Sequence, residues 1–157
     1  MKIIRLGDRY FDVHAPAERA RVSSTALKSF LSLMSDWDVA DGNARVLLGR
    51  LTSEEFSRLR AQPDAQILDA NKLKRIASLL SIHRELSLLY GPGVAGEWVQ
   101  LPNSHAMFCR VKPINYMLIG GVQAMASVLR LLTRRRRAAQ QTQAEDLSSP
   151  QQLPPPE

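Results

Sequence analysis

The sequence has little of what a disulfide-stabilised or membrane-spanning protein requires. It contains one cysteine, Cys109, among 157 residues, and 6% of its residues are aromatic. A single cysteine excludes an intramolecular disulfide, and no uninterrupted apolar run approaches the roughly 20 residues of a transmembrane helix. No apolar signal-peptide segment follows the start of the sequence. These absences predict a cytoplasmic protein in a reducing environment, without a membrane partner.

Motifs of enzyme active sites are also missing. The sequence has no HExxH zinc motif, no Gly-x-Ser-x-Gly nucleophile turn and no Gly-x-Gly-x-x-Gly phosphate loop. Its three histidines and Cys109 are scattered, whereas zinc ligands follow characteristic spacings. The acidic pair Glu54 and Glu55 fits the start of a helix, where negative charge is stabilising. We therefore expect a protein that is not an enzyme and that uses no metal or cofactor.

Positive charge is concentrated near the C-terminal end. The formal net charge is +6, and Arg130 together with the run Arg134 to Arg137 supplies five positive charges. The basicity is thus local and is not spread over a nucleic-acid-binding surface.

Apolar spacing predicts an all-α fold between two less ordered ends. Residues 1–23 are expected to form a loosely docked arm, because their apolar residues suit one short strand without a partner. Residues 24–90 form a helical region resembling a helix-turn-helix, and residues 91–139 form a second helical region. Residues 140–157 are rich in Gln, Ser and Pro and are expected to be a disordered tail.

Capping signals divide the first helical region. A helix of about three turns is expected from Ser24. Asp38 can cap a second helix that ends at Gly49 in a left-handed conformation. Thr52 and Glu55 fit a capping box at the start of a third helix over residues 54–60. Asp69 opens the longest periodic segment, whose wide apolar face predicts a central helix packed on two sides.

Glycine and proline divide the second helical region. Gly91 and the proline that follows it end the long helix, and a short helix is expected over residues 94–101. Pro113 suits the first turn of a helix over residues 114–119. Gly120 and Gly121 then interrupt the pattern, and a final helix begins at Val122 and runs into the arginines.

Residues 39–60 match the outline of a helix-turn-helix motif, which binds DNA through its second helix. The candidate DNA-contacting residues are Thr52, Ser53, Ser57, Arg58 and Arg60. The match is incomplete, because Arg45 occupies the position where a small residue usually lets the two helices touch. An ordinary helical hairpin that covers the long helix is the alternative interpretation.

An ordered set of residues runs through the second half of the chain. Its members are Trp98, Pro102, Asn103, Phe108, Pro113, Met117, Gly120, Gly121, Val128 and Leu132. This series resembles the toxin-binding domain of the Xre/MbcA/ParS antitoxins. Residues 47–49 and 73–82 resemble the degenerate helix-turn-helix half and the central helix of the same family, so that the likeness covers about residues 36–133. The family often has glycine at the position of Arg110.

The resemblance implies a helical, non-enzymatic antitoxin of a type II toxin–antitoxin pair, often dimeric or assembled with its toxin. Its partner would be a RES-domain toxin that consumes NAD or transfers ADP-ribose, and the antitoxin would cover the active-site entrance. The candidate toxin-binding residues are Trp98, Asn103, Phe108, Arg110, Arg130, Arg134 and Arg135. Such a protein can also repress its own operon; a DNA-binding regulator without a toxin partner is the alternative function.

Several of these motif residues have a structural explanation that does not depend on the family. Trp98 is a large amphipathic anchor expected to seal the junction between the long helix and the last one. Asn103 suits a turn, because its side chain can bond the backbone two residues ahead. The positive charges of the arginine run would also stabilise the C-terminal end of a helix through its dipole.

Overall fold

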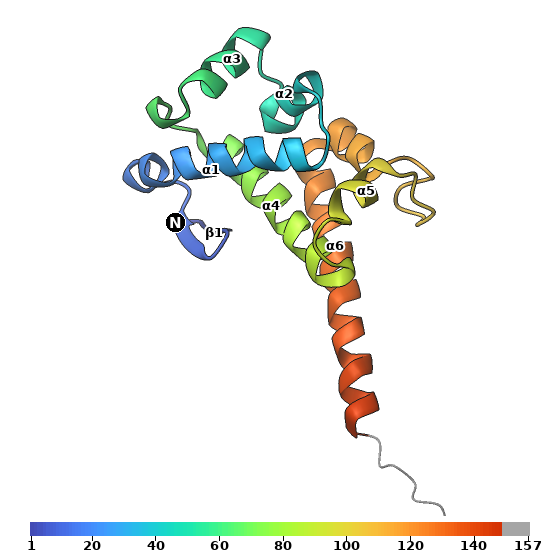
Figure 1. Cartoon of the computed structure of the whole chain (residues 1–157). Helices are drawn as coiled ribbons and strands as arrows, with labels where there is room; N and C mark the ends of the chain where they lie inside the picture. Colours follow the sequence, from blue (N-terminus) through green and yellow to red (C-terminus); the bar gives the residue numbers. More distant parts are fainter. Residues whose placement is uncertain (149–157) are drawn as a thin grey trace, which may run out of the picture.

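The computed structural model describes residues 1–148 and is mostly helical, at 71%, with about six helices and a small N-terminal β-hairpin (Figure 1). The elements in chain order are β1 (Ile3–Leu6), β2 (Arg9–Asp12), α1 (Pro16–Asp36), α2 (Asp41–Gly49), α3 (Ser53–Ala61), the 3₁₀ turn η1 (Pro63–Ala65), α4 (Ala70–Tyr90), α5 (Ala95–Gln100) and α6 (Pro113–Ser148). One continuous cluster of buried side chains joins the hairpin and both helical regions.

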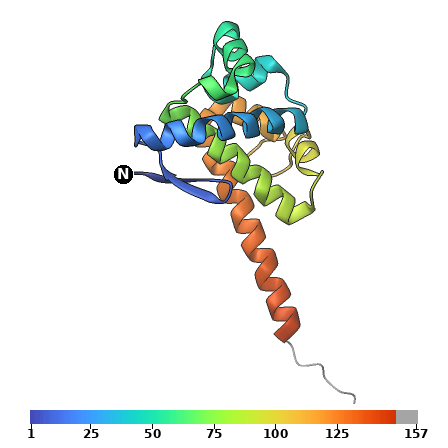
Figure 2. The same cartoon turned by 60° about the vertical axis from the view of Figure 1, so that its left-hand side comes forward.

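The N-terminal arm is partly a hairpin, so the expectation of an unpaired strand was wrong. β1 and β2 are antiparallel, with Leu6 paired to Arg9 across a two-residue turn at Gly7 and Asp8. The positive φ of Gly7, 60°, suits such a turn. Phe11 and Val13 are buried, and the hairpin packs on α1 and α4 (Figure 2).

The first helix begins at Pro16, eight residues before the expected start at Ser24. The Ala, Glu and Arg residues of this stretch are good helix formers, and proline is favoured in the first turn. The extension also has a packing role, since Ser23 is buried and its hydroxyl accepts a 2.9 Å hydrogen bond from the backbone N–H of Leu68.

The start and end of α2 differ from expectation. Asp38 does not cap the helix; Ala40 is at the N-cap, without a side-chain hydrogen bond, and Asp38 lies in a turn with φ of 53°. The left-handed residue after the helix is Arg50, with φ 59° and ψ 46°, whereas Gly49 has φ of 133°. The prediction of a left-handed residue at the end of this helix was therefore correct, but this residue lies one position further along the chain than expected.

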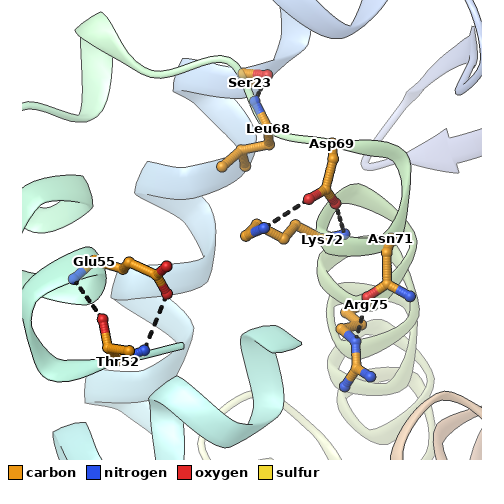
Figure 3. Close-up of polar contacts among 8 residues, drawn as sticks. All are labelled: Ser23, Thr52, Glu55, Leu68, Asp69, Asn71, Lys72 and Arg75. Carbon is orange, nitrogen blue, oxygen red and sulfur yellow. Dashed lines mark hydrogen bonds and ion pairs between the residues drawn. The ribbon is translucent and has the colours of Figure 1, made fainter. Parts of the chain in front are cut away.

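The starts of α3 and α4 confirm the capping predictions (Figure 3), and Gly91 caps the end of α4. The Thr52 hydroxyl accepts from the backbone N–H of Glu55 at 3.1 Å, and the Glu55 carboxylate accepts from the backbone N–H of Thr52 at 3.0 Å. The Asp69 carboxylate accepts from the backbone N–H of Lys72 at 2.8 Å, and α4 ends at Gly91. Helix α4 is central, as predicted, and packs against α1, α2, α5, α6 and β1.

Helix α6 is longer than predicted and is broken where predicted. Gly121 has non-helical dihedral angles, φ 62° and ψ −141°, inside α6. The helix continues to Ser148, so residues 140–148 are not the expected disordered segment, and the rest of that tail, residues 149–157, lies outside the described residues. Residues 137–148 are all exposed and project away from the body (Figure 1).

By length and composition, α6 also contains an 18-residue stretch apolar enough to cross a membrane, with a mean hydropathy of 1.3. The search for uninterrupted apolar runs did not find this stretch, because polar residues are distributed through the helix. Core helices of soluble proteins, which are mostly buried, meet the same criterion; 28% of this stretch is buried.

Candidate partner-binding surface

An apolar groove lies on the outer side of the first part of α6. It has a volume of about 440 Å³ and is formed by the loop before α6 and by the residues on both sides of the Gly121 break. Its lining residues are Met107, Phe108, Cys109, Val111, Tyr116, Ile119, Gly120, Gln123, Ala124 and Ser127. Ile119 is 79% exposed, and nothing among residues 1–148 covers it. The groove is thus an open apolar surface within the segment that resembles a toxin-binding domain.

An aromatic cluster supports this groove from below. Phe108 is 1% exposed, and its ring meets those of Trp98 and Tyr116 edge-on, with centroids 5.8 Å and 5.3 Å apart. Edge-to-face pairs at these separations are favourable. Trp98 is partly buried and packs against the core. Phe108 and Trp98 thus hold the loop on the helices, and the Phe108 side chain is too buried to contact a partner directly.

The loop before α6 is closed by its own backbone. The Asn103 side chain accepts from the backbone N–H of His105 at 2.9 Å, as predicted for a turn. The Asn103 carbonyl accepts from the backbone N–H of Arg110 at 3.2 Å, and its N–H donates to the carbonyl of Val111 at 3.3 Å. These bonds join the two ends of the loop, so that Asn103 has a structural role.

Two consecutive residues of the loop have left-handed backbone conformations. Cys109 has φ of 50° and Arg110 has φ of 65°. Left-handed conformations favour glycine, because a Cβ atom there crowds the backbone. The antitoxin family often has glycine at the Arg110 position. The backbone here has a glycine-like conformation at this position, and Arg110, which is exposed, stands in the sequence between the lining residues Cys109 and Val111.

We expect Arg110→Gly to stabilise the protein. Relief of the left-handed strain, about 1–2 kcal/mol, should exceed the extra unfolded-state entropy of glycine, about 0.4–1 kcal/mol. The net gain in the free energy of unfolding is measured by urea denaturation. Arg110→Ala is the matched control, because it removes the same charge and keeps the Cβ atom. An equal effect of both variants would show that charge, and not backbone strain, is responsible.

The arginine run is divided between two roles. Arg136 forms an ion pair with Glu85 of α4 at 2.5 Å, and the two side chains are 25% and 12% exposed. Arg135 donates to the Tyr90 hydroxyl at 3.2 Å. These two arginines attach α6 to α4, so the candidate toxin contact Arg135 is occupied within the fold.

The other arginines lie on the opposite side of α6. Arg130, Arg134 and Arg137 follow a spacing of four and three residues, which places them on one helix face, and all three are exposed. We call them the basic stripe. None forms an ion pair with a residue among 1–148. Gln123 and Ser127 belong to the same face and also line the groove, so the stripe continues the groove along α6.

The candidate DNA-contacting residues lie together around the start and outer side of α3, at one end of the molecule (Figure 1). Thr52, Ser53 and Ser57 are exposed, and Thr52 belongs to the capping box in Figure 3. The Arg60 guanidinium is bonded to the Asp41 carboxylate at 2.8 Å, whereas Arg58 is exposed and has no ion pair among the described residues. Arg58 is therefore the only arginine of this set available to a phosphate.

Partly buried polar groups lie where α2, α4 and α6 meet. The Arg75 guanidinium donates to the Asn71 side chain at 2.8 Å (Figure 3). It also donates to the Leu47 carbonyl at 3.3 Å. Burial, followed by the nearby charge of Arg50, lowers the pKa of Arg75. Burial alone would raise the pKa of Asp69, but hydrogen bonds from Lys72 outweigh it and lower the pKa. These contacts connect elements of the fold, and within residues 1–148 no group of three or more His, Cys, Asp or Glu is placed to hold a metal.

The candidate toxin-binding residues did not include Ile119, Gln123 or Arg137, although Arg137 belongs to the arginine run. Ile119 is an apolar residue directly before the glycine pair, off the buried face of its short helix. Gln123 and Arg137 could have been found by counting helical turns from Arg130.

No protein-family model, curated protein or solved structure matches this chain. A functional assignment therefore rests on the geometry described above and on the resemblance of individual residues to the antitoxin family.

Proposed function

We propose that this protein is the antitoxin of a type II toxin–antitoxin pair, and that it binds a RES-domain toxin and covers the entrance to its active site. The open groove beside Ile119 is the observation that carries the proposal. It lies in the segment that resembles the toxin-binding domain, and it combines an apolar lining with a neighbouring cation, since the Arg130 guanidinium donates to the hydroxyl of the lining residue Ser127 at 3.1 Å. Protein interfaces commonly have this composition, with an apolar centre and a polar rim.

The backbone at Arg110 supports the same assignment. A loop that keeps a glycine-like conformation with an arginine in place retains strain of about 1–2 kcal/mol. Strain of this kind is often found at functional sites. We interpret the exposed Arg110 guanidinium as a contact to the partner.

The basic stripe supports the chemistry of the partner. Guanidinium groups bind carboxylates and phosphates through paired hydrogen bonds. The stripe would pair with carboxylates at the mouth of the toxin's NAD pocket, so that the bound antitoxin blocks the entry of the substrate. The antitoxin would then need no reaction of its own, since inhibition would be steric and electrostatic.

The proposal predicts that a neighbouring gene encodes a RES-domain toxin, and co-expression with that toxin tests the proposal. We expect the antitoxin to restore growth, to co-purify with the toxin, and to stop NAD consumption by the purified toxin at a stoichiometric ratio. Full toxin activity in an excess of the antitoxin would overturn the proposal. Turnover of NAD by this chain alone would also contradict it.

We expect Ile119→Arg to weaken toxin binding about thirtyfold, because an anchor at the centre of an interface is worth about 2 kcal/mol. The affinity is measured by titration calorimetry with the purified toxin. Ile67→Arg is the matched control, since Ile67 is 68% exposed and lies in the loop between η1 and α4, away from the groove. Equal losses in the two variants would place the interface elsewhere.

A further inference from the structure

A second groove lies between β1, α4 and α6, with a volume of about 330 Å³. Its lining residues come from three elements. Helix α4 supplies residues at the spacing of one helix face, Lys74, Ala77, Ser78 and Ser81. The N-terminal segment supplies Lys2, Ile4 and Arg5, and α6 supplies Val122 and Leu129. Leu129 is two residues from Ser127 of the first groove, which is about 200° around a helix. The two grooves therefore lie on opposite sides of α6.

The second groove follows the outer edge of β1. Side chains alternate between the two faces of a strand, so Ile4 and Arg5 point to opposite faces, and both line the groove. Two such neighbours can line one groove only where it runs along an edge of the strand. Strand β2 contributes no residue, so the edge is the one that faces away from β2 (Figure 2).

This edge carries unpaired backbone groups. Hydrogen-bonded pairs alternate along an antiparallel ladder, and the bond from the Val13 N–H to the Lys2 carbonyl, 2.9 Å, fixes which pairs are bonded. By this alternation the N–H and C=O of Ile3 and Arg5 point away from β2. No hydrogen bond joins these groups to another backbone group of residues 1–148. A row of this kind is a template for a further strand.

The groove is cationic and has no acidic side chain in its lining. Lys2, Arg5 and Lys74 line it, together with two serines and four apolar residues. The ammonium groups of Lys2 and Lys74 form no ion pair with a residue among 1–148. The Arg5 guanidinium has an exposed ion pair with Asp8 at 3.7 Å, donates to the Gly7 carbonyl at 2.7 Å and lies over the Tyr10 ring. The charges of the two lysines are thus available to an occupant.

We propose that an extended, acidic segment of a partner protein binds along β1 as a third strand. Its backbone would pair with Ile3 and Arg5, and its apolar side chains would point into the groove from one face. Its carboxylates would lie on the other face, where Arg5 points, and its negative charge would also be attracted by Lys2 and Lys74. A second copy of this chain fits less well, because two β1 edges would bring Lys2 and Arg5 against the same cations of the other copy. This site does not depend on the toxin interface.

The probe is a synthetic peptide of about seven residues in which valine alternates with glutamate. With the full chain labelled with ¹⁵N, we expect the amide signals of Ile3 and Arg5 to shift on addition of the peptide, and the counterpart with lysine in place of glutamate to have no effect. Shifts elsewhere only, or none, would overturn the proposal and leave the cations as a guard against edge pairing. Concentration-dependent dimers with shifts at Ile3 would assign the edge to a second copy and would also overturn it.

Two matched pairs of variants sharpen the test. Lys74→Glu should weaken peptide binding at least about tenfold through like-charge repulsion, whereas Lys112→Glu, an exposed lysine of the loop before α6, should not. Ile3→Pro removes an outward amide of β1 and should abolish binding, whereas Tyr10→Pro removes one at the outer edge of β2 and should preserve it. Equal effects within either pair would contradict the proposal.

Discussion

Replacement of Trp37 with alanine is expected to lower the free energy of unfolding by about 3–5 kcal/mol. The Trp37 side chain is 0% exposed and is among the largest buried side chains of the core. Its indole N–H donates to His83 Nδ1 at 3.1 Å, which joins the end of α1 to the middle of α4. Alanine would leave a large cavity and would remove the donor for a partly buried imidazole.

The measurement is urea denaturation followed by circular dichroism, because the substitution removes a fluorescent probe. Trp98→Ala is the matched control, and we expect about 1–2 kcal/mol, since Trp98 is only partly buried. Trp37→Phe separates packing from the hydrogen bond to His83. A larger loss for Trp98→Ala than for Trp37→Ala would contradict the burial of the two indoles.

The two tryptophans show why burial was difficult to predict from local pattern. Trp37 follows the polar pair Ser35 and Asp36, so its position resembles the exposed end of a helix. It is buried because α5, from a distant part of the sequence, packs against the same end of α1. That approach requires Gly96, where a Cβ atom would lie 2.7 Å from the Asp36 carbonyl oxygen. The burial of Trp37 thus depends on long-range contacts, which a local pattern does not contain.

Most signals that act within one turn of the chain were predictive, although Asp38 does not cap α2. The capping box at Thr52, the Asp69 cap and the break at Gly121 are all present, because each depends on a backbone conformation that the local residues determine. The hairpin had such a signal too, in the Gly7 turn between two short apolar segments, and it was overlooked. By contrast, residues 137–148 bury nothing, so only the helix propensity of Ala, Gln and Glu could have indicated a helix there.

The candidate site was predictable in part. Helical spacing is enough to separate Arg130, Arg134 and Arg137 from Arg135 and Arg136. It does not show which face is free, because that depends on Glu85 and Tyr90 of α4. Arg110 could be singled out only as a departure from the family pattern, and its left-handed backbone became evident in the fold.

Reversal of the basic stripe, with Arg130, Arg134 and Arg137 all changed to glutamate, is expected to reduce toxin affinity at least about a hundredfold. Opposed like charges across an interface are strongly unfavourable, and the three side chains are exposed, so the fold should be preserved. The neutralisation of toxin in co-expressing cells should be lost. The affinity of the unmodified protein should decrease as salt is added, because exposed charges are screened.

The matched control changes Arg9, Arg21 and Arg84 to glutamate, which gives the same net charge at exposed positions on β2, α1 and α4. If net charge alone guided the toxin to its partner, both triple variants would lose affinity to the same degree, and the basic stripe would have no special role. If only the stripe variant fails, the cations must act at short range. Restored binding to a toxin with lysines in place of carboxylates at its pocket mouth would then identify the opposing groups, because exchange of the charges recreates the pairing.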